Sequence, residues 1–288
     1  MPSQGPLIPR RRLGAELRRL REAAGLHLEH AAAHLECSTS KISRLETGQG
    51  IPKTRDIRDL LGLYGLTDQR AQDRLLRLAG DGRRQAWWQG LDLNEAMTGS
   101  MDQYISLESE ASLQRDYSCS FIFGQFQTEE YAKALFSGLF EHAPQSTVDS
   151  RVQLRMKRQA EFRARTDRPR LDIVLDESTL RRRVGSAEVM RAQLAELLLV
   201  NDTPGYRLRV LPFSARPDMG MQCSYVIFTF DSDFDRNAVH IELPGGDRWL
   251  EVEADVERYT RFFQALVEKS LDEEETNALI KEIMAYHQ

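Results

Sequence analysis

The stretch of sequence that decides the fold is HLEHAAAHLECSTSKISRLE, residues 27–46. Its apolar residues recur at helical spacing on both sides of a short polar break, which predicts one helix over residues 27–35 and another over 39–47. Ser38 is a good N-cap for the second helix, and Gly48 follows its end. Ala31 and Ala32 are small enough to let the two helices cross closely, as a helix-turn-helix requires.

Further helices are expected on both sides of this pair, over residues 9–24, 54–64 and 67–79. Leu17 and Leu20 can share one small core with the apolar residues of the pair, which are Leu28, Leu35, Ile42 and Leu45. The sequence therefore predicts an N-terminal domain of five helices over residues 1–80.

The outer face of the helix over 39–47 carries short polar side chains, and the candidate DNA contacts lie on it or beside it: Ser38, Thr39, Ser40, Lys41, Ser43 and Arg44. Small hydroxyls let a helix approach a major groove, while Lys41 and Arg44 can reach bases or phosphates. The run Arg10-Arg11-Arg12 is expected to form a basic tail in which Arg11 and Arg12 grip the DNA. The alternative for the helix pair is a plain helical bundle whose charged side chains form a solvated face. The alternative for the arginine run is a solvated, disordered terminus.

Three motifs, Leu13-Gly14, Ala24-Gly25-Leu26 and the run from Ser43 to Gly48, resemble the XRE family of helix-turn-helix regulators, whose fold is lambda-repressor-like. The resemblance implies base contacts from the start of the helix over 39–47. It also implies phosphate contacts from the start of the preceding helix, where His27 replaces the usual Thr or Gln. Finally, it implies a structural ion pair between Arg21 and Glu46 that fixes the recognition helix.

The charge is divided unevenly along the chain. Residues 1–84 carry 16 Lys or Arg against 10 Asp or Glu, a formal charge of +6, whereas the remaining residues carry 23 against 34, or −11. A basic end on an acidic body suggests that only this end meets a polyanion. With no apolar run long enough for a membrane span, no signal peptide and three widely separated cysteines, we expect a soluble protein in the reducing cytoplasm.

A Gly- and Arg-rich linker is expected over residues 81–103, followed by a domain over 104–288. The predicted helices of this domain cover residues 103–115, 128–141, 147–165, 187–200, 255–269 and 272–286, and the predicted strands 171–175, 206–211, 224–230, 238–243 and 249–252. The fold class is therefore a multi-domain chain in which an α domain precedes an α+β domain, with the strand order left open.

Several motifs of this second domain, among them Gln127-Thr128-Glu129, Arg155-Met156-Lys157 and Val210-Leu211-Pro212-Phe213, resemble the uncharacterised C-terminal domain of actinobacterial XRE regulators, an antitoxin-like and WhiJ-like group. The resemblance implies a two-domain regulator that is often encoded beside a small partner protein. Two loops depart from the family pattern, Phe123-Gly124-Gln125-Phe126 and the segment 214–221. If these loops line a pocket, this chain accepts a different ligand from its relatives.

Two groups of residues are candidates for binding an effector or a partner. Arg151, Arg155, Arg158 and Gln159 form a ridge at helical spacing that can bind an anionic effector or an acidic protein. The alternative is a set of surface ion pairs to the acidic remainder of the domain. Trp87 and Trp88 are either a ligand cage or, more simply, packing anchors at a domain joint.

Three constellations bear on enzymatic or metal chemistry. Asp176-Glu177 is a carboxylate pair after a strand, Cys223 and His240 are a nucleophile and a base, and His30 and His34 have the spacing of metal ligands. Nothing in the sequence orients any of these sets, and no phosphate loop or dinucleotide fingerprint is present. We therefore expect no enzyme, no cofactor and no metal.

The sequence as a whole indicates a transcriptional regulator that binds a double-stranded DNA operator. A homodimer on an inverted repeat is expected, because one helix-turn-helix contacts too little DNA for strong specificity. The acidic domain would dimerise or respond to a small-molecule effector or to a small acidic partner protein encoded nearby. The alternative is an antitoxin-like protein that neutralises a cognate small protein and binds DNA for autoregulation.

Overall fold

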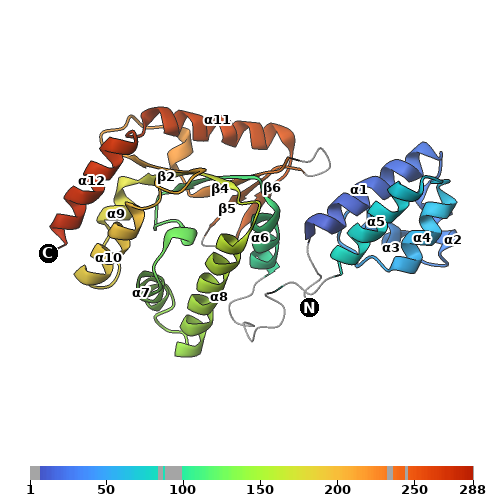
Figure 1. Ribbon diagram of the computed structural model, residues 1–288, viewed down its shortest axis with the longest axis horizontal. Coiled ribbons are helices and arrows are strands. Elements are labelled where there is room, and N and C mark those ends of the chain that lie inside the picture. The colour runs from blue at the N-terminus through green and yellow to red at the C-terminus, as the bar shows by residue number, and fades with distance from the viewer. Residues whose placement is uncertain (1–6, 84–86, 88–98, 232–235, 244–245, 288) are drawn as a thin grey trace. The chain divides into compact units, whose positions relative to one another are not determined.

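The computed structural model describes residues 7–83, 87, 99–231, 236–243 and 246–287. The chain divides into two compact units, of which the first contains the N-terminal helices and residues 102–110, and the second contains the sheet and the remaining helices (Figure 1). Most of the predicted linker and Trp88 lie outside the described residues. Helix α6 begins at Gly99, inside the predicted linker, and ends at Glu110.

The N-terminal helices form a bundle that we call the head. Its elements are α1 Leu7–Ala23, α2 Leu28–His34, α3 Thr39–Glu46, α4 Thr54–Leu63 and α5 Gln69–Asp81. The five predicted helices are confirmed with small shifts at their ends, and α5 is capped by Asp68, whose side chain accepts the N–H of Arg70. One apolar core joins the helices and includes Leu13, Leu17, Ile42, Ile57 and Leu60.

The second unit is built on one mixed sheet of six strands. These are β1 Leu113–Ser118, β2 Arg170–Asp176, β3 Tyr206–Leu211, β4 Tyr225–Thr229, β5 Ala238–Ile241 and β6 Arg248–Leu250. Their order in the sheet is β3-β2-β1-β4-β5-β6. The pairs β1–β2 and β2–β3 are parallel, and the other pairs are antiparallel. The predicted α+β fold is confirmed.

Helices cover both faces of the sheet (Figure 1). They are α7 Glu129–Leu139, α8 Gln145–Ala164, α9 Glu177–Arg181, α10 Ala187–Leu197, α11 Glu253–Lys269 and α12 Glu273–Tyr286. Leu171 and Ile173 of β2 pack in a core with α7, α8, α10 and α12, whereas Val174 packs in a second core with α11. This alternation follows from the two-residue period of a strand.

The prediction of a helix over residues 103–115 is wrong at its C-terminal end, because strand β1 begins at Leu113. The strand escaped detection since Leu113 and Tyr117 are its only apolar residues and Arg115 interrupts them on the same face. Gln114 and Asp116 are buried on the face opposite Tyr117, so the strand shows no simple hydrophobic period. As the third strand in the sheet order, β1 has neighbours on both sides.

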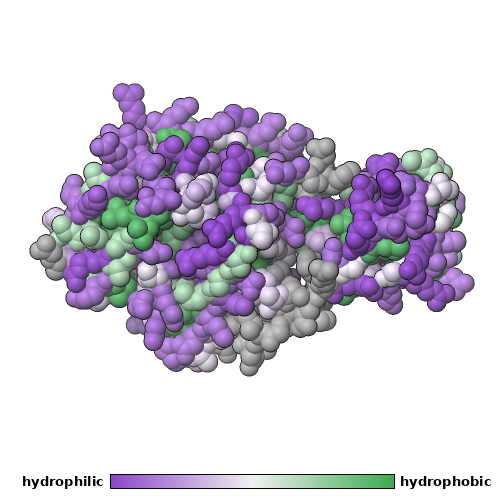
Figure 2. Space-filling view, in the orientation of Figure 1, coloured by the Kyte–Doolittle hydropathy of each residue, from purple (hydrophilic) through white to green (hydrophobic). Residues whose placement is uncertain are grey.

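Among the described residues, no helix combines the length and the apolar character needed to cross a membrane. The surface shown in Figure 2 is mainly hydrophilic, with apolar residues scattered over it. Phe213, Met219 and Tyr286 are examples of large apolar side chains that are more than half exposed.

Candidate DNA-binding surface and effector pocket

Helix α3 is seated in the core of the head by its apolar side. Its first turn is capped by Ser38, whose hydroxyl accepts the N–H of Lys41 at 3.3 Å. Ile42 and Leu45 are buried, and Ala31 and Ala32 of α2 are buried in the same core as Ile42. The predicted close packing of the two helices on small residues is therefore present.

Two glycines bring α1 against the end of α3. A Cβ atom at Gly14 would lie 2.5 Å from the carbonyl oxygens of both Leu45 and Glu46. Gly48 has a φ of +73°, and a Cβ there would lie 2.9 Å from the backbone nitrogen of Arg11. Only glycine permits this backbone contact, and at Gly48 it also permits the left-handed conformation that ends the helix.

Arg21 and Glu46 form the ion pair that the sequence predicts. Nε and Nη2 of Arg21 donate to the two carboxylate oxygens of Glu46 at 2.7 and 2.9 Å, and Nη1 donates to the carbonyl of Leu26 at 2.8 Å. Both side chains are nearly buried, and the hydrogen bond to Glu46 raises the pKa of Arg21. Burial raises the pKa of the neighbouring Tyr64 to about 12. The pair ties α1 to the last residue of α3.

The face of α3 that points away from the core is short and polar. Ser40 and Arg44, one turn apart, are exposed, and Ser43 beside them is half-buried. Thr39 and Ser38 are exposed at the start of the helix. The predicted contacts on α3 therefore share one accessible face, with the exception of Lys41.

Lys41 lies at the flank of α3 and is engaged within the head. Its Nζ donates to a carboxylate oxygen of Asp56 in the first turn of α4 at 2.5 Å, and 34% of its side chain is exposed. The sequence predicted a DNA contact, whereas the structure gives Lys41 a bond that joins α3 to α4. Sequence spacing did not reveal this bond because Asp56 lies 15 residues away.

The start of α2 is capped through a histidine pair. The backbone N–H of His27 donates to Nδ1 of His30 at 3.0 Å, and the two exposed imidazole rings are stacked with centroids 5.8 Å apart. His30 thus provides one half of a capping box, in which the third residue of the helix accepts the N–H of the residue that precedes the helix. His34 is exposed at the other end of α2, and no cluster of three metal-ligating side chains occurs among the described residues.

The prediction of a basic tail is wrong in its conformation, because residues 10–12 lie inside α1. Arg10 is buried, and Arg11 and Arg12 are half-buried. The helix begins at Leu7, ahead of the expected Pro9, since Ile8 joins the buried apolar residues. An arm that enters an adjacent groove cannot start at these arginines.

Sequence reasoning missed three exposed residues near the recognition helix. Thr47 extends the stripe of Ser40 and Arg44 by another turn, and its hydroxyl donates to the carbonyl of Ser43 at 2.9 Å. Lys53 and Arg55 are exposed at the start of α4, which the bond between Lys41 and Asp56 holds beside α3. Helical spacing from Ser40 would have indicated Thr47, but the location of the α4 start needs the fold.

The predicted arginine ridge on α8 faces inward rather than outward. Arg158 and Gln159 are buried, and Gln159 Nε2 donates at 2.8 Å to the carbonyls of Gly124 and Gln127. Arg155 donates to the Gln127 side chain at 2.5 Å and lies over the ring of Phe136. Arg151 likewise stacks on an aromatic ring, that of Phe140. These contacts hold the 122–128 segment and α7 against α8, so the predicted ridge is not an exposed row of side chains. Trp87, the other candidate described, is half-buried.

The remaining polar candidates of the second unit have structural positions. Asp176 caps α9 by accepting the N–H of Ser178 at 2.9 Å, and Glu177 accepts the N–H of Phe213 at 2.8 Å. Cys223 precedes β4 on the face of Tyr225, whereas His240 pairs with Val226 and so lies on the opposite face of the sheet. The structure does not bring Cys223 and His240 together.

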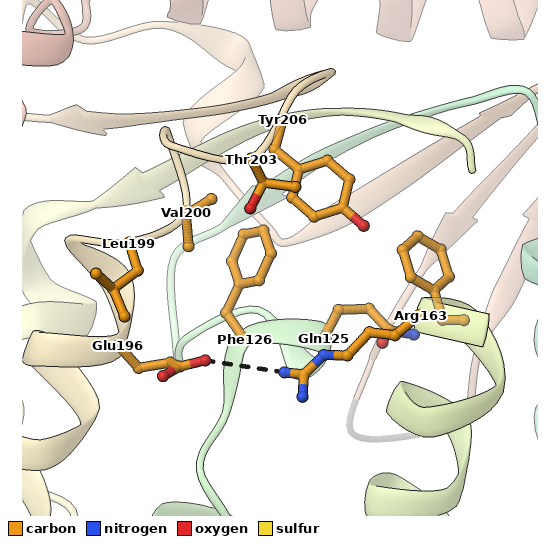
Figure 3. A pocket seen from close by; sticks show the side chains of 9 residues that line it. Gln125, Phe126, Arg163, Glu196, Leu199, Val200, Thr203 and Tyr206 are labelled. Atoms are coloured by element: carbon orange, nitrogen blue, oxygen red, sulfur yellow. Dashed lines mark ion pairs between the residues drawn. The ribbon is translucent and has the colours of Figure 1, made fainter. Parts of the chain in front are cut away.

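A pocket opens in the second unit where α8 and α10 end. Its cavity of about 130 Å³ is lined by Gln125, Phe126, Phe162, Arg163, Glu196, Leu199, Val200, Thr203 and Tyr206. Phe126 and Tyr206 face each other with ring centroids 6.2 Å apart, and Arg163 and Glu196 approach to 3.9 Å at one side (Figure 3). Of the two loops that depart from the family pattern, the one containing Gln125 and Phe126 lines this pocket, and the segment 214–221 does not.

Two family models match the chain. Residues 12–75 match a helix-turn-helix domain, which includes most of α1, all of α2 to α4 and part of α5. Residues 101–282 match a domain of unknown function, DUF5753, which spans the sheet and most of the helices around it. No curated protein and no solved structure matches the chain. Because the second match covers more than half of the sequence, the chain belongs to the DUF5753 family, and it carries a helix-turn-helix domain of the DNA-binding type in front of that domain.

Proposed function

We propose that this protein is a sequence-specific transcriptional regulator that reads its operator with helix α3. The observation that carries the proposal is the two-sided character of α3. Ile42 and Leu45 are buried in the head, while Ser40 and Arg44 are exposed on the opposite side. A helix with small hydroxyls and one long arginine on its outer face fits a major groove, where arginine pairs with guanine.

The contacts and the charge of the head support the proposal that α3 binds DNA. The contacts of Gly14 and Gly48 with α1 and α3, together with the bidentate bond between Arg21 and Glu46, fix the recognition helix at its C-terminal end. A rigid recognition helix loses little conformational entropy on binding. The formal charge of +6 on residues 1–84, against −11 on the rest, favours the head as the part that meets the phosphates.

We further propose that the protein acts as a homodimer. A single head presents one short recognition helix of eight residues, which reaches only a few base pairs. Two heads on an inverted repeat double the number of specific contacts and give the affinity that regulators need. We infer that the C-terminal domain supplies the dimer contacts and the response, and that it is a binding domain rather than an enzyme. The engagement of Asp176 and Glu177 in helix and loop hydrogen bonds supports this inference.

The aromatic pocket is the candidate effector site. With a volume of about 130 Å³ it is smaller than the usual ligand pocket of about 300–1,000 Å³, so it suits a molecule of a single ring. Phe126 and Tyr206 offer ring contacts, and Arg163 offers a charge for an acidic group. In a thermal-shift screen, a single-ring aromatic acid that binds this pocket should raise the unfolding temperature of the protein. The variant Thr203→Trp, which fills the edge of the pocket, should abolish this increase. Equal stabilisation of both proteins would exclude this pocket.

Selection from a library of random DNA duplexes tests the main proposal. The wild-type protein should enrich a motif with two related half-sites, and Arg44→Ala should fail to enrich it. Arg74→Ala is the matched control, because Arg74 is an exposed arginine of the head on α5 and should leave the motif unchanged. If Arg44→Ala enriches the same motif as the wild type, α3 does not read the bases.

A further inference from the structure

Two of the three cysteines, distant in sequence, flank neighbouring strands of the sheet: Cys119 follows β1, and Cys223 precedes β4. Strands β1 and β4 pair antiparallel with Tyr117 opposite Tyr225. Both cysteines lie beyond these strands, and the same register, extended by two residues, places Cys119 opposite Cys223. Both residues are on the α11 side of the sheet, and both pack against the core that contains Tyr117 and Tyr225.

Contacts beyond the last paired residues keep the two segments together. The backbone N–H of Cys119 donates to Oγ of Ser224 at 3.0 Å, and its Sγ lies 3.3 Å from the same oxygen. Residues directly opposite in an antiparallel pair have Cα atoms about 4.5–5.5 Å apart. That range lies within the separation of about 4.4–6.8 Å that a disulfide spans, so little backbone movement is required.

Both thiols can be reached by a small oxidant. Cys119 and Cys223 are half-buried and reduced in the structure, so neither is sealed within the core. The third cysteine, Cys37, is half-buried in the head beside the turn between α2 and α3. The chain therefore contains one matched pair of thiols and one built-in control.

We propose that Cys119 and Cys223 form a reversible intramolecular disulfide in response to a peroxide. In the first step the thiolate of Cys119 attacks one oxygen of hydrogen peroxide, the O–O bond breaks, and the leaving hydroxide takes a proton to become water. The thiol of Cys223 then attacks the resulting sulfenic acid, so that the S–S bond forms, the S–O bond breaks and a second water leaves. Two thiols are oxidised while one peroxide is reduced.

The environment of the two sulfurs favours this order of attack. Ser224 accepts the N–H of Cys119 through its oxygen, which leaves its own O–H able to donate to the Cys119 sulfur. Burial raises the pKa of Cys223, which disfavours its thiolate. Cys119 is thus suited to react first with the oxidant, and Cys223 to resolve the sulfenic acid.

The test treats the full-length protein with hydrogen peroxide and counts the thiols that remain. The count should fall from three to one, with a peptide map under non-reducing conditions that links the peptides of Cys119 and Cys223, and dithiothreitol should restore all three. The variant Cys37→Ser should still form the bond. The variants Cys119→Ser and Cys223→Ser should each fail to form it, and circular dichroism before oxidation checks that they are folded.

Two results would overturn the proposal. One is a wild-type protein that keeps all three thiols under peroxide concentrations that oxidise a free thiol of an unfolded control. The other is a peptide map in which the principal disulfide includes Cys37 or joins two molecules. A protein whose Cys119 proceeds to sulfinic acid without bonding to Cys223 would overturn the proposal as well, because the pair would then be too far apart to react.

Discussion

At Gly14 the backbone of α1 touches the last turn of the recognition helix. A methyl group there would lie 2.5 Å from two carbonyl oxygens of α3, so Gly14→Ala must move one helix away from the other. We expect the head to lose about 1–3 kcal/mol of stability, as overpacked cores do. Urea unfolding followed by circular dichroism measures the loss.

The matched control for this substitution is Gly62→Ala in α4. A Cβ atom at Gly62 has no neighbour within 4 Å, and alanine favours helix over glycine. This variant should gain about 0.5–1 kcal/mol. Equal effects of the two substitutions would contradict the close contact of α1 with α3.

The bond between Arg21 and Glu46 gives a second prediction for a single residue. Glu46→Ala leaves the nearly buried Arg21 without its principal partner, so we expect the unfolding free energy to fall by about 3–5 kcal/mol, together with weaker DNA binding. Glu22→Ala removes an exposed carboxylate from the same arginine, 3.7 Å away, and should change stability little. If Glu46→Ala is as stable as Glu22→Ala, the pair does not fix α3.

The recognition helix and the α8 ridge show how far residue-level prediction extends. The outward face of α3 could be predicted because its apolar residues, Ile42 and Leu45, mark the buried side. The same spacing rule failed for Arg158 and Gln159, which are polar yet buried. Gln159 donates to the main-chain carbonyls of Gly124 and Gln127, which lie 35 and 32 residues away, and no local pattern predicts such distant partners.

At the scale of an element, polar residues at buried positions explain why one strand, β1, could not be predicted from the sequence. Helices α1 to α5, and strands β2 to β6, could be predicted from periodicity and turn residues. Strand β1 could not, because Gln114 and Asp116 stand at buried positions where the hydrophobic pattern predicts apolar side chains. The strand order also depends on long-range pairing, which local propensities do not encode.

Strand β5 gives a prediction about pH, because it places His240 in a buried position. Burial lowers the pKa of His240 below its ordinary value of 6.5, and Asp247, whose carboxylate lies 3.4 Å from Nε2, offsets this only in part. As the pH falls below about 6.5, the histidine of the unfolded chain therefore binds a proton more readily than the buried histidine of the folded chain. Stability is full above about pH 6.5 and declines as the pH falls below it.

Thermal unfolding at pH 7.5 and pH 5.5 measures this dependence. The wild-type second unit should unfold at a lower temperature at pH 5.5, and His240→Gln should reduce the difference. His142→Gln, which changes an exposed histidine of the same unit, should retain it. A wild-type protein with equal transitions at the two pH values would contradict the buried, neutral state of His240.

At the scale of the whole molecule, the proposed homodimer predicts the form of the DNA-binding site. Sedimentation should give a dimer, and the selected DNA motif should be an inverted repeat with half-sites about 34–36 Å, or one helical turn, apart. Removal of residues 87–288 should leave a monomeric head that binds one half-site weakly. A truncated head that binds DNA as tightly as the full-length protein would contradict dimerisation through the C-terminal domain.

The division of the chain into a DNA-binding head and a larger domain could be predicted from charge and motifs, and so could the fold class of each part. The aromatic pocket could not be predicted, because its lining comes from η2 (Gly124–Phe126), α8, α10 and the segment that leads into β3. These elements are separated by up to 81 residues, from Gln125 to Tyr206, and only the folded sheet brings them to one place. The pairing of Cys119 with Cys223 is hidden in the sequence for the same reason.

The most direct test of the account is the affinity of wild type and Arg44→Ala for the selected duplex and for a scrambled duplex, measured by fluorescence anisotropy at one salt concentration. A base contact from Arg44 predicts that the variant loses about 1–3 kcal/mol of binding free energy on the selected duplex, or about 5- to 150-fold in affinity per head. On the scrambled duplex the loss should be much smaller. Equal losses on both duplexes, or no loss on either, would contradict the claim that α3 reads the operator.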